Sequence, residues 1–118
     1  MKTEKDLFRL GHIRDCIDKI IELTKSVHSF ENFESKWIEQ DAMMRNFEII
    51  GEASNHISEE TKEKFPEVEW SLMRGMRNFI SHVYFGVDLD NIWDTAINDI
   101  PKLKSQIEDI ISNLQDYE

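Results

Sequence analysis

Apolar residues follow a helical period along most of the chain. In the first segment they recur at spacings of three and four, with charged residues between them: Leu7, Leu10, Ile13, Ile17, Ile20 and Ile21. This spacing gathers apolar side chains on one face and predicts a helix over residues 4–27. The polar stretch HSFENFES interrupts the pattern, and a second stripe predicts a helix over residues 35–58. That stripe consists of Ile38, Met43, Met44, Phe47, Ile50, Ser54 and Ile57.

The second half of the chain is also helical in pattern. The stretch EETKEK predicts one polar helical turn that ends before Pro66, because a residue preceding proline avoids the α region. A third long helix is predicted over residues 70–83, with a packing stripe of Leu72, Met73, Met76, Phe79, Ile80 and Val83. A final helical segment is predicted from Asp88 or Asp90 to Leu114, with Ile97 among its apolar positions. Pro101 should kink or split this segment.

These elements define the expected fold class. No stretch alternates between apolar and polar residues with a period of two, so no strand is expected. The sequence predicts a single all-α domain over residues 1–118, built as an up-and-down bundle of four to five helices. Gly51 lies inside the second predicted helix, where glycine is about 1 kcal/mol less favourable than alanine. We therefore expect another helix to approach the chain closely at Gly51.

Charge and composition narrow the class of function. The formal net charge is −10 and the pI is near 4.8, which argues against a protein coated with positive charge for duplex DNA. A nucleic-acid substrate is still compatible with this charge, because a local basic cleft can coexist with an acidic exterior. The single cysteine, Cys16, cannot form an internal disulfide. The N-terminal stretch is charged throughout and no apolar run is long enough to span a membrane, so we expect a soluble cytoplasmic protein.

The stretch RGMRNFISHVYFGVD carries the candidate chemistry. At about 100° per residue, Arg77 and Tyr84 nearly eclipse each other on the predicted helix, and Asn78 and His82 share a neighbouring face. Both pairs of residues lie mostly on the side of the predicted helix opposite its packing stripe. An ordinary polar helix surface is the alternative interpretation, because cations are common near helix C-termini. The spacing by itself leaves this alternative open.

These residue types suit RNA cleavage without a metal ion. A histidine titrates near neutrality and can move the proton of a 2′-hydroxyl or of the leaving 5′-oxygen. An arginine presents a planar set of donors to a phosphoryl group that gains charge. An asparagine can orient the imidazole or the phosphate, and a tyrosine can donate a hydrogen bond or stack on a base. One histidine is too few for an acid–base pair, and a two-fold dimer would supply a second.

The run RNFISHVY matches the pattern R-x-x-x-x-H-x-Y and resembles the signature of HEPN-superfamily ribonucleases. The chain as a whole resembles the HepT-like branch through three further blocks in order: RNFEIIGEAS, FPEVEWSLMRGMRN and YFGVDLDNIWDTAINDIPKL. The likeness extends from about residue 5 to residue 114. It implies an all-α bundle that forms a homodimer and joins two motif-bearing helices over a shared cleft.

The resemblance also implies roles for individual residues. Arg77 and His82 would be the catalytic residues of a metal-independent RNA endonuclease that needs no cofactor, and Asn78 and Tyr84 would support them. Family members are commonly toxins of a type VII HepT/MntA-like system. The antitoxin, a small nucleotidyltransferase, is thought to neutralise the toxin by transferring AMP to the motif tyrosine, here Tyr84. A bulky anion there would occupy the phosphate site beside Arg77.

Several interpretations remain open. RNA binding by an acidic protein requires a local positive pocket, which we expect Arg45 and Arg74 to form with Arg77, helped by the dimer partner. The chain could instead be a non-catalytic helical binding partner of a minimal nucleotidyltransferase, since an acidic surface also suits protein binding. Glu52 is either a partner of an arginine or a buried packing carboxylate, and the second interpretation is preferred.

No metal site is expected, because the other histidines lack ligand-like spacing: His12, His28 and His56. Cys16 stands beside Ile13 and Ile17 and is interpreted as a small core residue rather than a nucleophile.

Overall fold

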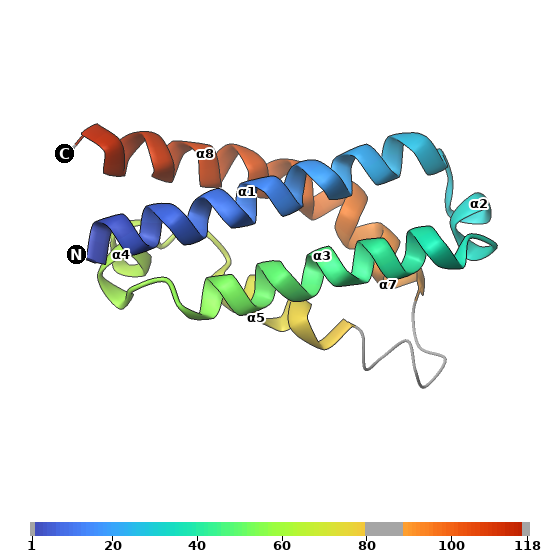
Figure 1. The fold of residues 1–118 in the computed structure, drawn as a ribbon, viewed down its shortest axis with the longest axis horizontal. Coiled ribbons are helices and arrows are strands. Elements are labelled where there is room, and N and C mark those ends of the chain that lie inside the picture. Colours follow the sequence, from blue (N-terminus) through green and yellow to red (C-terminus); the bar gives the residue numbers. More distant parts are fainter. Residues whose placement is uncertain (1, 80–88, 117–118) are drawn as a thin grey trace.

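A computed structural model describes residues 2–79 and 89–116 of the chain. Three long helices form its body: α1 (Lys2–Val27), α3 (Trp37–Asn55) and α8 (Ile100–Asp116). Helix α1 packs against both α3 and α8, and the three run side by side along the long axis (Figure 1). Within the described ranges no strand occurs, so the all-α prediction is confirmed.

Short elements connect and cover the long helices: α2 (Phe30–Glu34), α4 (Glu59–Lys64), α5 (Trp70–Gly75), the 3₁₀ turn η1 (Met76–Asn78), α7 (Leu89–Asp94) and the π-helical turn η2 (Thr95–Asp99). The helices predicted over 4–27 and 35–58 correspond to α1 and α3, and the turn predicted before Pro66 is α4. Helix α2 lies in the stretch that was expected only to break the pattern. It is too short for a periodic stripe, and the Ser29 side chain caps it by accepting a hydrogen bond from the Asn32 N–H.

The third predicted helix is less regular than its sequence pattern suggests. Helix α5 covers residues 70–75 and continues as the tighter turn η1, while residues 80–83 of the prediction lie outside the described residues. The final predicted segment stays helical from residue 89 to residue 116, and its winding changes just before Pro101, where a kink or split was expected. Helix α8 begins at Ile100, immediately before Pro101, and η2 separates it from α7. Proline lacks an N–H donor, so the pattern of backbone hydrogen bonds in a helix changes next to it.

The core consists of the inward faces of these helices. The largest fully buried side chains include Leu10, Ile13, Ile17, Ile20, Phe33, Met43, Phe47, Ile50, Met73, Met76, Ile92 and Ile100. Three positions of the predicted stripes are wrong, because Ile38, Leu72 and Ile97 are exposed, Ile38 by 62%. Each lies toward one edge of an apolar stripe, and periodicity does not tell how wide a face the neighbouring helices cover.

A buried carboxylate ties α1 to the start of α4. Asp6 is 1% exposed and accepts hydrogen bonds from the Ser58 N–H (3.0 Å), the Ser58 hydroxyl (2.6 Å) and the Thr61 hydroxyl (2.6 Å). Ser58 is also the N-cap of α4 and accepts from the Thr61 N–H. Buried polar groups are tolerated when they are hydrogen-bonded, and here the bonds hold two helices together.

No helix in the described part of the chain is both long and apolar enough to cross a membrane.

Candidate active site around Arg77

The backbone of Arg77 lies directly against α3 at Gly51. A Cβ atom placed on Gly51 would lie 2.5 Å from the Arg77 backbone nitrogen and 2.8 Å from the Arg77 Cβ. Gly51 is buried, and only glycine leaves room for η1 at this distance. The expectation of a close approach at Gly51 is therefore confirmed, and the approaching segment is η1.

Buried side chains at three-residue spacing hold the Arg77 segment in place. Met73 and Met76 are fully buried, and the Phe79 ring meets the Phe47 ring of α3 edge to face with centroids 5.0 Å apart. Because these residues face α3 and the core, Arg77 and Asn78 between them are exposed. The outward orientation predicted for Arg77 and Asn78 is confirmed.

The predicted alignment of this polar face extends beyond the described residues. It paired Arg77 with Tyr84 and Asn78 with His82, on the assumption of a regular helix with about 100° per residue. The turn η1 is wound more tightly, at about three residues per turn. His82 and Tyr84 lie outside the described residues, so the predicted alignment remains a prediction.

Glu52 of α3 provides an anionic partner for Arg77. Its Oε2 lies 3.7 Å from Arg77 Nη1, and its Oε1 lies 3.2 Å from His56 Nε2. The side chains of Arg77 and Glu52 are 43% and 59% exposed. The preferred interpretation of Glu52 as a buried packing carboxylate is thus wrong. Glu52 follows Gly51 in the sequence and points outward, whereas Gly51 faces the protein interior.

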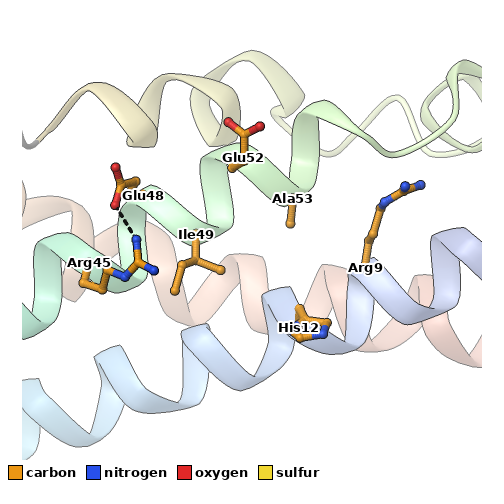
Figure 2. A pocket seen from close by; sticks show the side chains of 7 residues that line it. All are labelled: Arg9, His12, Arg45, Glu48, Ile49, Glu52 and Ala53. Atoms are coloured by element: carbon orange, nitrogen blue, oxygen red, sulfur yellow. Dashed lines mark hydrogen bonds and ion pairs between the residues drawn. The ribbon is translucent and has the colours of Figure 1, made fainter.

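A cavity of about 490 Å³ lies between α1 and α3 beside this ion pair. Figure 2 shows Arg9 and His12 on α1 facing a row of α3 residues that lines the cavity: Arg45, Glu48, Ile49, Glu52 and Ala53. Arg45 Nη1 donates to Glu48 Oε1 at 2.8 Å, and Arg9 Nη1 donates to the His56 carbonyl at 3.1 Å. The cavity thus contains guanidinium, imidazole and carboxylate groups around an apolar floor.

The structure separates the two arginines proposed for RNA binding. Arg45 lines the cavity between α1 and α3, which Glu52 connects to Arg77. Arg74 is exposed on α5 and lines a different cavity of about 230 Å³, together with Glu59 and Lys62 of α4. Neither Arg9 nor a role for His12 in this cavity was predicted from the sequence. Their spacing of three on α1 was a weak signal, and only the packing of α1 on α3 makes it meaningful.

Other candidate chemistry is limited in the described part of the chain. Residues 2–79 and 89–116 contain no group of three or more His, Cys, Asp or Glu side chains placed to hold a metal ion. Cys16 is buried, and burial raises the pKa of its thiol, which disfavours the reactive thiolate. The interpretation of Cys16 as a core residue is confirmed.

Comparison with known proteins places this chain in a family. The profile described as "Ribonuclease HepT-like" matches residues 13–110. The chain belongs to the HepT-like ribonuclease family. The matched range contains α3 with Gly51 and Glu52, and it contains Arg77 with the whole R-x-x-x-x-H-x-Y run. The resemblance inferred from the sequence is therefore confirmed at the level of the family.

Curated relatives of this HepT-like chain carry ribonuclease names. "Putative RNase MJ1380" of Methanocaldococcus jannaschii is 41% identical over 99 residues, which cover 84% of this chain and 90% of the relative. "Putative RNase TTE0752" of Caldanaerobacter subterraneus subsp. tengcongensis is 38% identical, over 94% of this chain and 96% of the relative. "Probable ribonuclease HepT" of Thermococcus cleftensis is 41% identical, over 91% and 94%. A comparison with solved structures gives no significant match.

Proposed function

We propose that this HepT-like chain is a metal-independent RNA endonuclease. The observation that carries the proposal is the exposed Arg77 guanidinium, which begins the R-x-x-x-x-H-x-Y motif in a chain of a ribonuclease family. Its backbone is seated on Gly51, which places the start of the motif at the surface beside α3. The ribonuclease names of the relatives support the same class of substrate.

The proposed reaction is an attack by the RNA on its own backbone. The 2′-oxygen attacks the adjacent phosphorus while His82 accepts the 2′-hydroxyl proton. The bond between phosphorus and the 5′-oxygen then breaks, and the 5′-oxygen leaves with a proton. The products are a 2′,3′-cyclic phosphate and a 5′-hydroxyl. Arg77 donates hydrogen bonds to the phosphoryl oxygens, whose negative charge grows in the transition state. Asn78 supports the site from the position next to Arg77.

A homodimer would complete the acid–base chemistry. One chain supplies one motif histidine, whereas the reaction needs a base and an acid. A two-fold axis beside the motif would bring His82 of a second copy to the same phosphodiester. Sedimentation equilibrium should therefore give twice the chain mass of 14.0 kDa. A monomer at the concentrations where RNA is cleaved would contradict the shared site.

Cleavage of total RNA in excess chelator tests the enzymatic proposal. We expect cleavage by the unmodified protein and at least a roughly 100-fold slower rate for Arg77→Ala and for His82→Ala. Lys104→Ala is the matched control, because Lys104 pairs with Asp18 at 2.8 Å on α8 and α1 and belongs to no proposed site. If either motif variant cleaves RNA as fast as the unmodified protein, the residue assignment is wrong. Lack of cleavage together with tight binding to a nucleotidyltransferase would favour the non-catalytic alternative.

We further propose that the chain is the toxin of a toxin–antitoxin pair, with a MntA-like nucleotidyltransferase as its antitoxin. Transfer of AMP to Tyr84 would place a bulky anion near Arg77 and cancel its positive charge. Intact mass spectrometry after co-expression with such a nucleotidyltransferase should show added AMP units. These should be lost in Tyr84→Phe. Modification that persists in Tyr84→Phe would assign the acceptor to another residue.

A further inference from the structure

We infer that Glu52 is the positioning residue for Arg77, and this inference rests on the proposed ribonuclease function. Glu52 occupies the outward face of α3, one residue after the glycine that seats the Arg77 backbone. Two consecutive residues of α3 therefore act on Arg77 in different ways. Gly51 determines where its main chain lies, and Glu52 determines the direction of its guanidinium.

The two oxygens of the Glu52 carboxylate face different partners, Arg77 and His56. One oxygen, Oε2, faces Arg77 Nη1 at 3.7 Å, and the other, Oε1, faces His56 Nε2 at 3.2 Å. A guanidinium group has five N–H donors in a fixed plane. At 3.7 Å the pair is an ion pair without a hydrogen bond, so the negative charge of Glu52 attracts the guanidinium toward α3 and leaves its N–H donors for a phosphoryl group.

The support for Glu52 continues to α1. The His56 side chain holds Glu52, and the His56 carbonyl accepts a hydrogen bond from Arg9 Nη1 at 3.1 Å. His56 is also the C-cap of α3, where a cation of α1 meets the negative end of the helix dipole. Two contacts thus meet at His56 beside the end of α3: its carbonyl accepts from Arg9, and its ring faces the Glu52 carboxylate.

Because the Arg77–Glu52 ion pair is exposed, an effect of Glu52 on the position of Arg77 can be distinguished from an effect on the stability of the fold. The Arg77 and Glu52 side chains are 43% and 59% exposed, and ion pairs this exposed contribute little to the free energy of unfolding. Removal of the Glu52 carboxylate should leave the fold intact. It should affect the alignment of Arg77, on which the stabilisation of the transition state depends.

The charge of Glu52 predicts a characteristic kinetic effect. A carboxylate beside the phosphate site repels RNA in the ground state, so its removal should not weaken substrate binding. Its removal should release the guanidinium from the orientation that the transition state requires. We expect Glu52→Ala to lower kcat about tenfold while KM stays equal or decreases.

The kinetic experiment compares Glu52→Ala, Glu52→Gln and Asp18→Ala. The glutamine keeps the size of the side chain but lacks its negative charge, so it should lower kcat nearly as far as the alanine does. Asp18 also forms an exposed ion pair, with Lys104, and its removal should change neither constant. A Glu52→Ala kcat within twofold of the unmodified value would overturn the inference. So would a loss of kcat that is accompanied by a lowered melting temperature in Glu52→Ala and is absent from Glu52→Gln.

A second measurement does not depend on cleavage. In nitrogen-resolved NMR, the Arg77 guanidinium can be assigned as the signal absent from Arg77→Lys. Restricted rotation should separate its two Nη signals in the unmodified protein, and Glu52→Ala should merge them. Unchanged signals in Glu52→Ala would overturn the positioning role even if the protein cleaves RNA. Merged signals in a protein that does not cleave RNA would refute the proposed function and leave the positioning of Arg77 supported.

Discussion

At the scale of single residues, Gly51 connects the core to the candidate site. Its missing side chain allows the Arg77 backbone to approach α3 within 2.5 Å of where a Cβ would stand. The unusual position of a glycine inside a helix could be recognised from the sequence. The identity of its neighbour could not, because Gly51 and Arg77 meet only when α5 and η1 pack on α3.

Gly51→Ala should therefore destabilise the protein and displace Arg77. The added methyl group meets backbone atoms that cannot rotate away, and overpacking of this kind destabilises by about 1–3 kcal/mol. Urea denaturation measures the change. Gly11→Ala is the matched control, because Gly11 lies in α1 with no atom near its missing Cβ. It should stabilise by about 0.5–1 kcal/mol. Equal stability of the two variants would contradict the contact.

At the scale of elements, short helices depend on tertiary anchors more than long ones do. Helices α1, α3 and α8 carry periodic apolar stripes, and their approximate bounds follow from the sequence. Helix α4 has only six residues and a mostly polar sequence, so its own propensity cannot hold it in place. The buried Asp6 of α1 supplies the anchor through Ser58 and Thr61.

Asp6→Ala should lower the free energy of unfolding by about 3 kcal/mol. The substitution removes a buried charged acceptor and leaves the Ser58 N–H and two hydroxyl groups without it. Chemical denaturation with circular dichroism gives the free energy of unfolding. Asp15→Ala, an exposed position of the same helix, should change it by less than about 0.5 kcal/mol. A similarly small effect at Asp6 would show that these hydrogen bonds do not hold α4 in place.

At the scale of the whole molecule, an acidic protein is proposed to bind an acidic polymer. The net charge of −10 makes long-range attraction to RNA unfavourable. Binding must then depend on a few local cations, for which Arg45, Arg74 and Arg77 are proposed. Arg45 and Arg74 line separate cavities, so an RNA strand would meet them at different points rather than in one basic pocket.

RNA affinity should therefore depend only moderately on salt. If about three cations of one chain contact single-stranded RNA, the slope of log affinity against log salt should be about −2. Fluorescence anisotropy with a His82→Ala variant and a labelled oligonucleotide measures it without cleavage. Arg45→Ala and Arg74→Ala should each make the slope shallower. A slope steeper than about −5 would indicate a broad basic surface and contradict binding through these three arginines.

The sequence by itself determined the helical class, the three long helices, the change of helix winding next to Pro101 and the outward orientation of Arg77 and Asn78. These features are local, because helical periodicity and proline geometry act between residues a few positions apart. The family could also be inferred from the sequence, through the motif and its flanking blocks.

Only the tertiary structure decided what Glu52 and Asp6 do. Both are carboxylates on helices, yet Asp6 is buried among hydroxyl groups and Glu52 is exposed beside Arg77. A carboxylate has the same local signature in either setting, and its role depends on partners brought in by packing. Asp6 and Ser58 are 52 positions apart, so no local pattern could pair them. The cavity between α1 and α3 arises in the same way, from two helix faces that only the fold brings together.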